Sequence, residues 1–264
     1  FVWQSLASQG VEFRQVDLST HAHNPEQALM ALCDQYTRLV AISAVQYANG
    51  LRLNLAELGA FCRQRGILLC VDAIQQLGAI PFDVQASQAD FVMADGHKWL
   101  LGPEGLGLFY VRREVQDQLR LTQYGWHMAD GLSDYSMETY QVAASAKRFE
   151  CGSPNMLGIH ALHTSLKLLL DTGMEEVWAQ LAARTAYLME GLQAIADIEL
   201  LSPTAPERRS GIVTFRSRTR SVESLYQLLR EQNIFCAPRG GGIRLSPHFY
   251  TPMAQLEQVL TALA

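Results

Sequence analysis

Hydrophobic positions in the first half of the chain form short apolar runs separated by amphipathic stretches. The runs have the length and residue types of β-strands, at 11–16, 38–44, 67–71, 91–94 and 107–111. The stretches between them space their apolar residues by three or four, as helices do. Strands that alternate with helices predict a mostly parallel sheet with right-handed crossovers.

Two helix starts carry capping sequences. Asn24 stands before Pro25 with Gln27 three residues on, and Asn54 stands three residues before Glu57. Side chains of this kind cap the free N–H groups of a first helical turn. The second helix should turn an apolar stripe inward, made of Leu55, Leu58, and Phe61 or Cys62.

The pattern changes from Ile159 onward. Two amphipathic helices are expected there, with the inward faces Ile159, Leu162, Leu166 and Leu169, then Met174, Val177, Leu181, Leu188 and Leu192. Short strands follow near 198–201, 211–215, 234–237 and 242–245, with a helix from Val222 and a last helix begun by Thr251 and Pro252. We therefore expect an α/β fold in two domains: residues 1–172 form a large domain with a helix-flanked sheet, and residues 173–264 a smaller C-terminal α+β domain.

Composition narrows the functional classes. The chain has 264 residues, of which 48% are hydrophobic and 18% charged, enough to bury a substantial core. A net charge of −5 predicts no nucleic-acid partner. No apolar run reaches the roughly 20 residues that span a bilayer, and no signal peptide opens the chain, so we expect a cytoplasmic protein without a membrane partner. Five cysteines without C-x-x-C spacing predict no metal site.

Two residues that follow apolar strands carry the chemistry. Asp72 comes directly after the run 67–71, and Lys98 follows the run 91–94. Ligand sites in open α/β sheets gather at the carboxyl ends of strands. A lysine amine forms an imine with an aldehyde, and a carboxylate bonded to a pyridine nitrogen keeps that ring an electron sink. The pair predicts a site for pyridoxal 5'-phosphate (PLP), held as a Schiff base on Lys98.

Two neighbours suit the same cofactor. Gln75 reaches the phenolic oxygen of the ring if residues 73–77 form a helical turn, and His97 can donate an N–H to the phosphate. Taken singly, Lys98 would be a surface charge and Asp72 a turn former. The four residues together favour the cofactor site.

Four sequence strings resemble one family. DAIQ, GHKWLLGPEGLG, KRFECGSPN and GGIRLSPHFYT together resemble the class V aminotransferases of PLP fold type I, a group that includes cysteine desulfurases, kynureninase and isopenicillin N epimerase. The resemblance implies that Lys98 forms the Schiff base and that Asp72 bonds the ring nitrogen. It also implies that Gln75 lies at the phenolic oxygen and His97 at the phosphate or ring.

The resemblance extends to the substrate and to a partner subunit. Arg244 matches the arginine that binds the substrate carboxylate, a role that suits a planar bidentate donor. Ser153 falls where some relatives reach the phosphate of the partner subunit, and Trp126 where relatives have a loop over the dimeric site. A homodimer is therefore expected.

Two departures from the family stand out. Asp95 replaces a serine of many relatives, and since a carboxylate would repel a phosphate, we expect it to cap a turn or pair with a cation. No phosphate-binding turn or ring-stacking residue precedes Phe1, and the helix-like residues 2–10 come after those elements in the family. We therefore expect an N-terminally incomplete chain.

Several reactions stay open. Transamination of an amino acid is the leading hypothesis, because it needs no additional nucleophile. Cysteine desulfuration is the runner-up and requires a thiol, for which Cys236 on an expected strand is the candidate; other lyase or epimerase reactions of the family are also open. A third hypothesis is a non-catalytic protein with a PLP fold. A nicotinamide dehydrogenase is disfavoured, because the dinucleotide-binding glycine pattern is missing.

Overall fold

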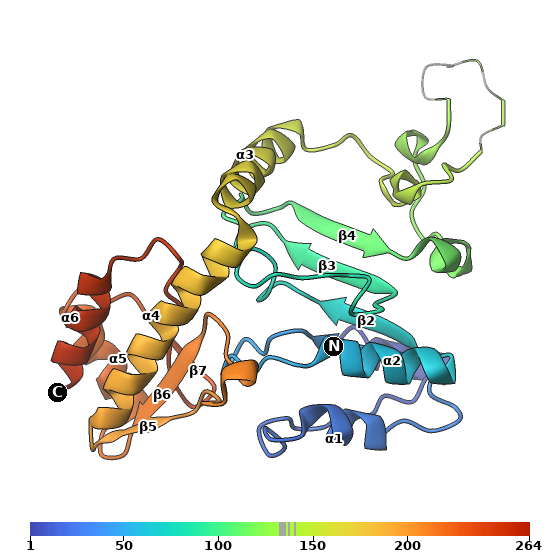
Figure 1. Cartoon of the computed structure of the whole chain (residues 1–264). Coiled ribbons are helices and arrows are strands. Elements are labelled where there is room, and N and C mark those ends of the chain that lie inside the picture. The colour runs from blue at the N-terminus through green and yellow to red at the C-terminus, as the bar shows by residue number, and fades with distance from the viewer. Residues whose placement is uncertain (132–135, 137, 140) are drawn as a thin grey trace.

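The computed structural model of the chain describes residues 1–131, 136, 138–139 and 141–264 (Figure 1). Two four-stranded sheets organise it, one in each half of the sequence. The described part also contains five short 3-10 helices: η1 (Gln4–Gln9), η2 (Arg113–Gln118), η3 (Trp126–Met128), η4 (Ala146–Phe149) and η5 (Pro206–Arg208).

The first sheet has the order β1-β2-β3-β4. Its strands are β1 (Leu39–Ser43), β2 (Leu68–Asp72), β3 (Phe91–Asp95) and β4 (Gly107–Val111). The first three are parallel and β4 runs antiparallel to β3. The predicted mostly parallel sheet with flanking helices is confirmed.

Helices α1 (Pro25–Ala31) and α2 (Leu55–Arg65) belong to this first unit. Leu58 and Cys62 of α2 are buried in a core with the β2 residues Leu69 and Val71. Asn54 caps α2 as predicted, because its side chain accepts the N–H of Glu57.

Two local predictions fail at the N-terminal end. Asn24 makes no side-chain cap at α1; the helix instead buries Glu26 in an ion pair with Arg208 of η5. Residues 11–16 are extended but form no strand, since they run past the edge strand β1 across a cavity and share no ladder with it. A strand needs a hydrogen-bonded neighbour as well as an apolar alternation.

The second sheet has the order β5-β6-β8-β7, and each neighbouring pair is antiparallel. Its strands are β5 (Ile198–Leu200), β6 (Val213–Ser217), β7 (Ala237–Arg239) and β8 (Gly242–Leu245). Helices α5 (Val222–Glu231) and α6 (Met253–Leu263) pack with it around one core. The strand expected at 234–237 is wrong: Asn233 has a left-handed φ of 58°, and Ile234 enters the core before β7 begins.

Two long helices connect the units: α3 (Met156–Thr172) and α4 (Met174–Ala194). The N-terminal part of α4 packs Val177 against the core beside β3. Its C-terminal part packs Leu188 and Leu192 into the core of the second sheet. Figure 1 shows α4 running diagonally between the two sheets. On α3, Leu162 and Leu169 are buried as predicted, but Ile159 is 40% exposed, because the helix covers little more than the loop after β3.

Candidate active site

Asp72 and Lys98 lie at the same edge of the first sheet. Asp72 is the last residue of β2, and Lys98 comes three residues after Asp95, which ends β3. The two strands are parallel and Asp72 pairs with Met93, so both chain segments leave the sheet side by side. Asp72 and Lys98 are each half-buried. The edge predicted from the sequence is therefore the one that brings them together.

The turn after β2 is tied to the lysine loop. The N–H of Leu77 donates to the carbonyl of Ala73 at 2.9 Å, which closes the helical turn expected over 73–77. Gln75 is buried, and its Oε1 accepts the indole N–H of Trp99 at 2.9 Å. This bond leaves the amide Nε2 of Gln75 as the group that can donate to a ligand.

A close backbone approach holds the same two segments together. Gly78 has a φ of 87°, and a Cβ at this position would lie 2.3 Å from the carbonyl oxygen of Trp99. Only glycine allows this contact and this conformation together. Leu101 also takes a left-handed φ, of 59°, so the backbone on both sides of Trp99 is tightly constrained.

Asp95 turns toward His97. Oδ1 of Asp95 lies 3.1 Å from Nδ1 of His97, within ion-pair distance, although the angle is too poor for a good hydrogen bond. The imidazole holds the pKa of the Asp95 carboxyl below its usual range. Asp95 therefore lies beside an imidazole, while its expected role as a turn cap or the partner of a cation stays a prediction, and Nε2 of His97 is left for other partners.

Arg244 reaches this edge from the second sheet. It lies on β8, and its Nη1 donates to the carbonyl of Tyr47, in the loop that follows β1, at 2.9 Å. Burial lowers the pKa of Arg244, and its buried Nε has no hydrogen-bond partner. A guanidinium with unused N–H groups can bind a carboxylate, so the geometry suits the role implied for Arg244.

His248 also belongs to this edge, although it was not predicted from the sequence. This residue is buried, its Nε2 lies 3.2 Å from the carbonyl oxygen of Trp99, and its ring stacks on Tyr250. Burial lowers the pKa of His248 and favours the neutral ring. The only sequence signal was its position in the string that also holds Arg244, so this contact is a tertiary one that positions the lysine loop.

Ser153 and Trp126 both belong to the segment between β4 and α3. Figure 1 shows the short helices of this segment beyond the end of β4, away from α3. Phe149 anchors that segment through an edge-to-face contact with Phe109 of β4, and Trp126 is 49% exposed. The roles of both residues stay predictions.

Cys236 lies one residue before β7, not on a strand as expected. It is half-buried beside the core of the second sheet, and burial raises the pKa of its thiol. A raised pKa lowers the thiolate fraction at neutral pH, so the surroundings of Cys236 do not activate it.

The donor set at the sheet edge fits PLP. Asp72 accepts one N–H, that of Ile74, and keeps acceptor capacity for a ring nitrogen. Gln75 and His97 each keep a free nitrogen, and the Nε of Arg244 is an orphaned buried donor. In the described part of the chain, no group of three or more His, Cys, Asp or Glu residues gathers as a metal site, and no helix combines the length and apolar character needed to cross a membrane.

The family model for class V aminotransferases matches residues 1–257, nearly the whole chain. The chain belongs to the class V aminotransferase family. Enzymes of this family depend on PLP, so the cofactor that the residues predicted is the family cofactor.

Similar proteins carry more than one activity name. The chain is 31% identical over 214 residues to a cysteine desulfurase of Cronobacter sakazakii, covering 81% of this chain and 51% of that protein. It is 30% identical to the uncharacterized aminotransferase YcbU of Bacillus subtilis, covering 86% of this chain and 59% of that protein. The chain thus spans about half the length of the curated relatives it matches.

Solved structures agree on the fold. The cystine C–S lyase C-DES, solved with its product cysteine persulfide, superposes with a TM-score of 0.90 at 26% identity, over 98% of this chain and 70% of that one. A C-DES mutant with glycine linked covalently to its PLP cofactor superposes with a TM-score of 0.91 at 25% identity, over 98% of this chain and 69% of that one. Both similarities place the chain in PLP fold type I.

Proposed function

We propose that the chain forms the core of an enzyme that transaminates a small α-amino acid, with Lys98 as the residue that attaches PLP. The observation that carries this proposal is the hydrogen bond between Trp99 and Gln75. This bond connects the loop that carries Lys98 to the turn that begins at Asp72. It therefore supports a fixed position of the Lys98 amine relative to the Asp72 carboxylate.

Each residue of the site would have a role that follows from its chemistry. PLP, when bound, supplies an aldehyde and an electron-withdrawing ring. Asp72 would accept the hydrogen bond of the ring nitrogen, and the Nε2 of Gln75 would donate to the phenolic oxygen. Arg244 would bind the substrate carboxylate through two parallel N–H donors, and the Lys98 amine would take the proton from Cα and deliver it to the cofactor.

Transamination is preferred because it needs no protein thiol. Desulfuration through Cys236 would require a reactive thiolate, whereas burial raises the pKa of this thiol. Its neighbours in the core of the second sheet are apolar as well. These surroundings favour a packing role for Cys236.

A second candidate is cleavage of a carbon–sulfur bond. Its support is the names of the relatives, which include a cysteine desulfurase and the cystine C–S lyase C-DES. Elimination across Cα–Cβ releases the sulfur leaving group directly, so this reaction also proceeds without Cys236.

We also propose a cytoplasmic homodimer in which Ser153 and Trp126 complete the site of the partner subunit. The support is the exposure of both residues in one protomer. A sedimentation mass of one chain at micromolar concentration would contradict this part of the proposal.

The first test is covalent trapping at Lys98. Protein mixed with PLP and reduced with borohydride is expected to carry one pyridoxyl group on the tryptic peptide that contains Lys98. Lys98→Ala should abolish the adduct, and Lys167→Ala, which removes an exposed helical lysine, should leave it unchanged. A colourless, unlabelled protein would support a non-catalytic fold.

The second test separates the two reactions by their products. The enzyme is incubated with alanine, glutamate, cysteine and cystine, and keto acids and sulfide are measured with and without a keto-acid acceptor. Transamination requires the acceptor and releases no sulfide. Sulfide from cysteine that is lost in Cys236→Ala would overturn the proposal in favour of a thiol-dependent desulfurase.

A further inference from the structure

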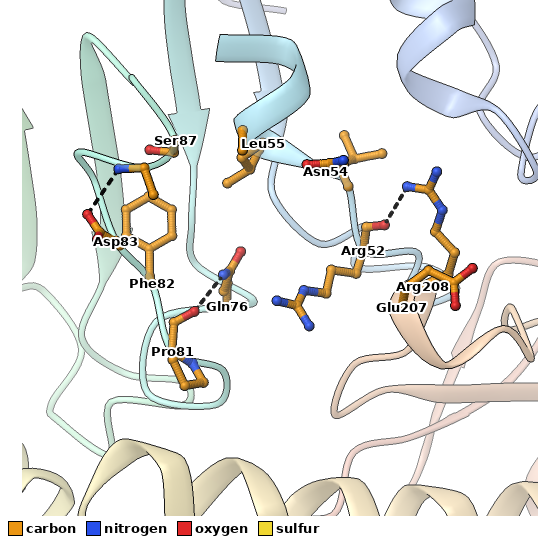
Figure 2. A pocket seen from close by; sticks show the side chains of 13 residues that line it. Arg52, Asn54, Leu55, Gln76, Pro81, Phe82, Asp83, Ser87, Glu207 and Arg208 are labelled. Atoms are coloured by element: carbon orange, nitrogen blue, oxygen red, sulfur yellow. Dashed lines mark hydrogen bonds between the residues drawn. The ribbon is translucent and has the colours of Figure 1, made fainter. Parts of the chain in front are cut away.

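A second cavity, distinct from the edge with Lys98, lies where the two halves of the chain meet. Its volume is about 360 Å³, within the range of about 300–1,000 Å³ typical of small-molecule sites. Its walls come from the start of α2, the loop after β2, and η5. Figure 2 shows these walls, with side chains from both halves facing the hollow.

Arg52 supplies an uncompensated positive charge to this cavity. Its guanidinium extends into the hollow toward Gln76 (Figure 2). The described residues include no carboxylate within ion-pair distance of Arg52; its recorded contact is with the ring face of Trp178, 5.8 Å from the ring centroid. Burial lowers the pKa of Arg52, but a guanidinium stays charged at neutral pH. The other arginine of the wall, Arg208, is already paired with Glu26.

Gln76 supplies an orphaned acceptor. The side chain is 4% exposed, and its Nε2 donates to the carbonyl of Pro81 at 3.2 Å. Its Oε1 is buried and has no hydrogen-bond partner. A buried polar atom without a hydrogen-bond partner destabilises the folded state. Because this oxygen lies in the wall of a cavity, we infer that a hydrogen-bond donor on a ligand is its partner.

The rim has the opposite charge to Arg52. Asp83 and Glu207 both line the cavity and are exposed. Figure 2 shows Asp83 and Glu207 on opposite sides of Gln76 and Arg52, and Oδ1 of Asp83 already accepts the N–H groups of Gln85 and Ala86. Both oxygens of a bound carboxylate can face Arg52, while a positive donor group on the same molecule faces Oε1 of Gln76. A molecule with a carboxylate and an ammonium close together satisfies Arg52 and Gln76 at once.

We propose that this cavity binds a free amino acid as a zwitterion, at a site separate from the Lys98 edge. The ligand would contact α2 and η5 together, so its binding would couple the two halves of the chain. This inference does not depend on the reaction proposed above.

The probe for this site must not react with PLP. N,N-Dimethylglycine carries a carboxylate and a tertiary ammonium, which cannot form an imine, and acetate carries the carboxylate alone. Binding of each to the cofactor-loaded protein is measured by ligand-observed NMR titration. We expect saturable binding of N,N-dimethylglycine and weaker binding of acetate.

Three substitutions decide where the probe binds. Arg52→Lys keeps the charge but loses the bidentate fork, so the affinity should fall about tenfold, and Arg52→Met should abolish binding. Gln76→Leu, which removes the unpartnered Oε1, should weaken binding of N,N-dimethylglycine more than binding of acetate. Arg220→Met, at an exposed arginine, is the matched control and should bind as wild type.

Two results would overturn the inference. Equal affinity in wild type and Arg52→Met would exclude Arg52 as the carboxylate partner. Loss of binding in Arg244→Met, with Arg52→Met unaffected, would assign the probe to the Lys98 edge instead. The second result would leave the proposed enzyme function standing, so the two proposals fail separately.

Discussion

At the scale of single residues, the indole of Trp99 decides how the site is held. Its N–H is committed to Gln75, its carbonyl oxygen lies against His248, and its ring is packed in a small core with Leu181 and Ile212. Trp99 itself has no reactive group. It positions Lys98, the residue before it, and so works as a structural support of the lysine loop.

Trp99→Phe tests this support. The change keeps an aromatic ring in the core and removes the indole N–H, which leaves the buried Oε1 of Gln75 without its partner. We expect a loss of about 1–3 kcal/mol in the free energy of unfolding, measured by urea denaturation. Trp178→Phe is the control, because no hydrogen bond of the Trp178 indole is described, and an equal loss in both variants would contradict the explanation.

At the scale of elements, the site depends on how closely two loops approach at the ends of β2 and β3. Both loops leave parallel neighbours at the same edge, and Gly78 lets the first pass against the carbonyl of Trp99 in the second. Neither loop could hold this path alone, since each supplies the partner that constrains the other.

Gly78→Ala and Gly66→Ala separate contact from backbone strain. Both glycines have left-handed φ values, 87° and 65°, but a Cβ on Gly66 would meet nothing within 4 Å. Gly66→Ala should therefore lower the unfolding free energy only by the cost of a left-handed backbone with a Cβ, about 1–2 kcal/mol. Gly78→Ala should cost clearly more in unfolding free energy and also weaken PLP binding, measured by absorbance titration. Equal costs would show that the close contact is unimportant.

At the scale of the whole molecule, several polar contacts connect the two halves. Glu26 of α1 is 1% exposed, accepts the backbone N–H of Asn54, and pairs with Arg208 of η5. The hydroxyls of Ser202 and Thr214 donate to carbonyls in the loop after β1. The loop that reaches Arg244 is therefore held by the second sheet.

Glu26→Gln gives a pH-dependent test of this joint. Burial alone would raise the pKa of Glu26, but hydrogen bonds from Arg208 and Asn54 outweigh burial and leave the pKa below its ordinary value of 4.5. A lowered folded pKa means that the carboxylate stabilises the fold above pH 4.5 and loses this effect as the pH falls through the folded pKa.

The expected loss of unfolding free energy in Glu26→Gln follows from the burial of the Glu26–Arg208 ion pair. At pH 7, Glu26→Gln leaves a largely buried guanidinium without its carboxylate and should cost about 3–5 kcal/mol of unfolding free energy. Below pH 4.5 the difference from wild type should narrow, as measured by urea denaturation at several pH values. A difference that stays constant from pH 7 to pH 3 would contradict the ionic role of Glu26.

Local chemistry made part of this fold and site predictable. Strand β4 begins and ends where expected, the cap at Asn54 forms, Asp72 is the last residue of its strand, and Lys98 follows the next strand. Prediction failed where a distant partner decides the outcome. Residues 11–16 have no hydrogen-bonded partner strand, and Ile159 is 40% exposed. The division at residues 172 and 173 stays a prediction, because α4 packs in the cores of both halves.

The sequence by itself determined the family, the parallel order of strands and helices, and the residues that carry the chemistry. These depend on residue type and on spacing over a few positions, which the linear chain records directly. Only the tertiary structure decided that Arg244 meets the loop after β1, that His248 lies under Trp99, and that Arg52 and Gln76 share a cavity. Those contacts join residues that lie far apart along the chain, so they exist only after the two sheets have packed.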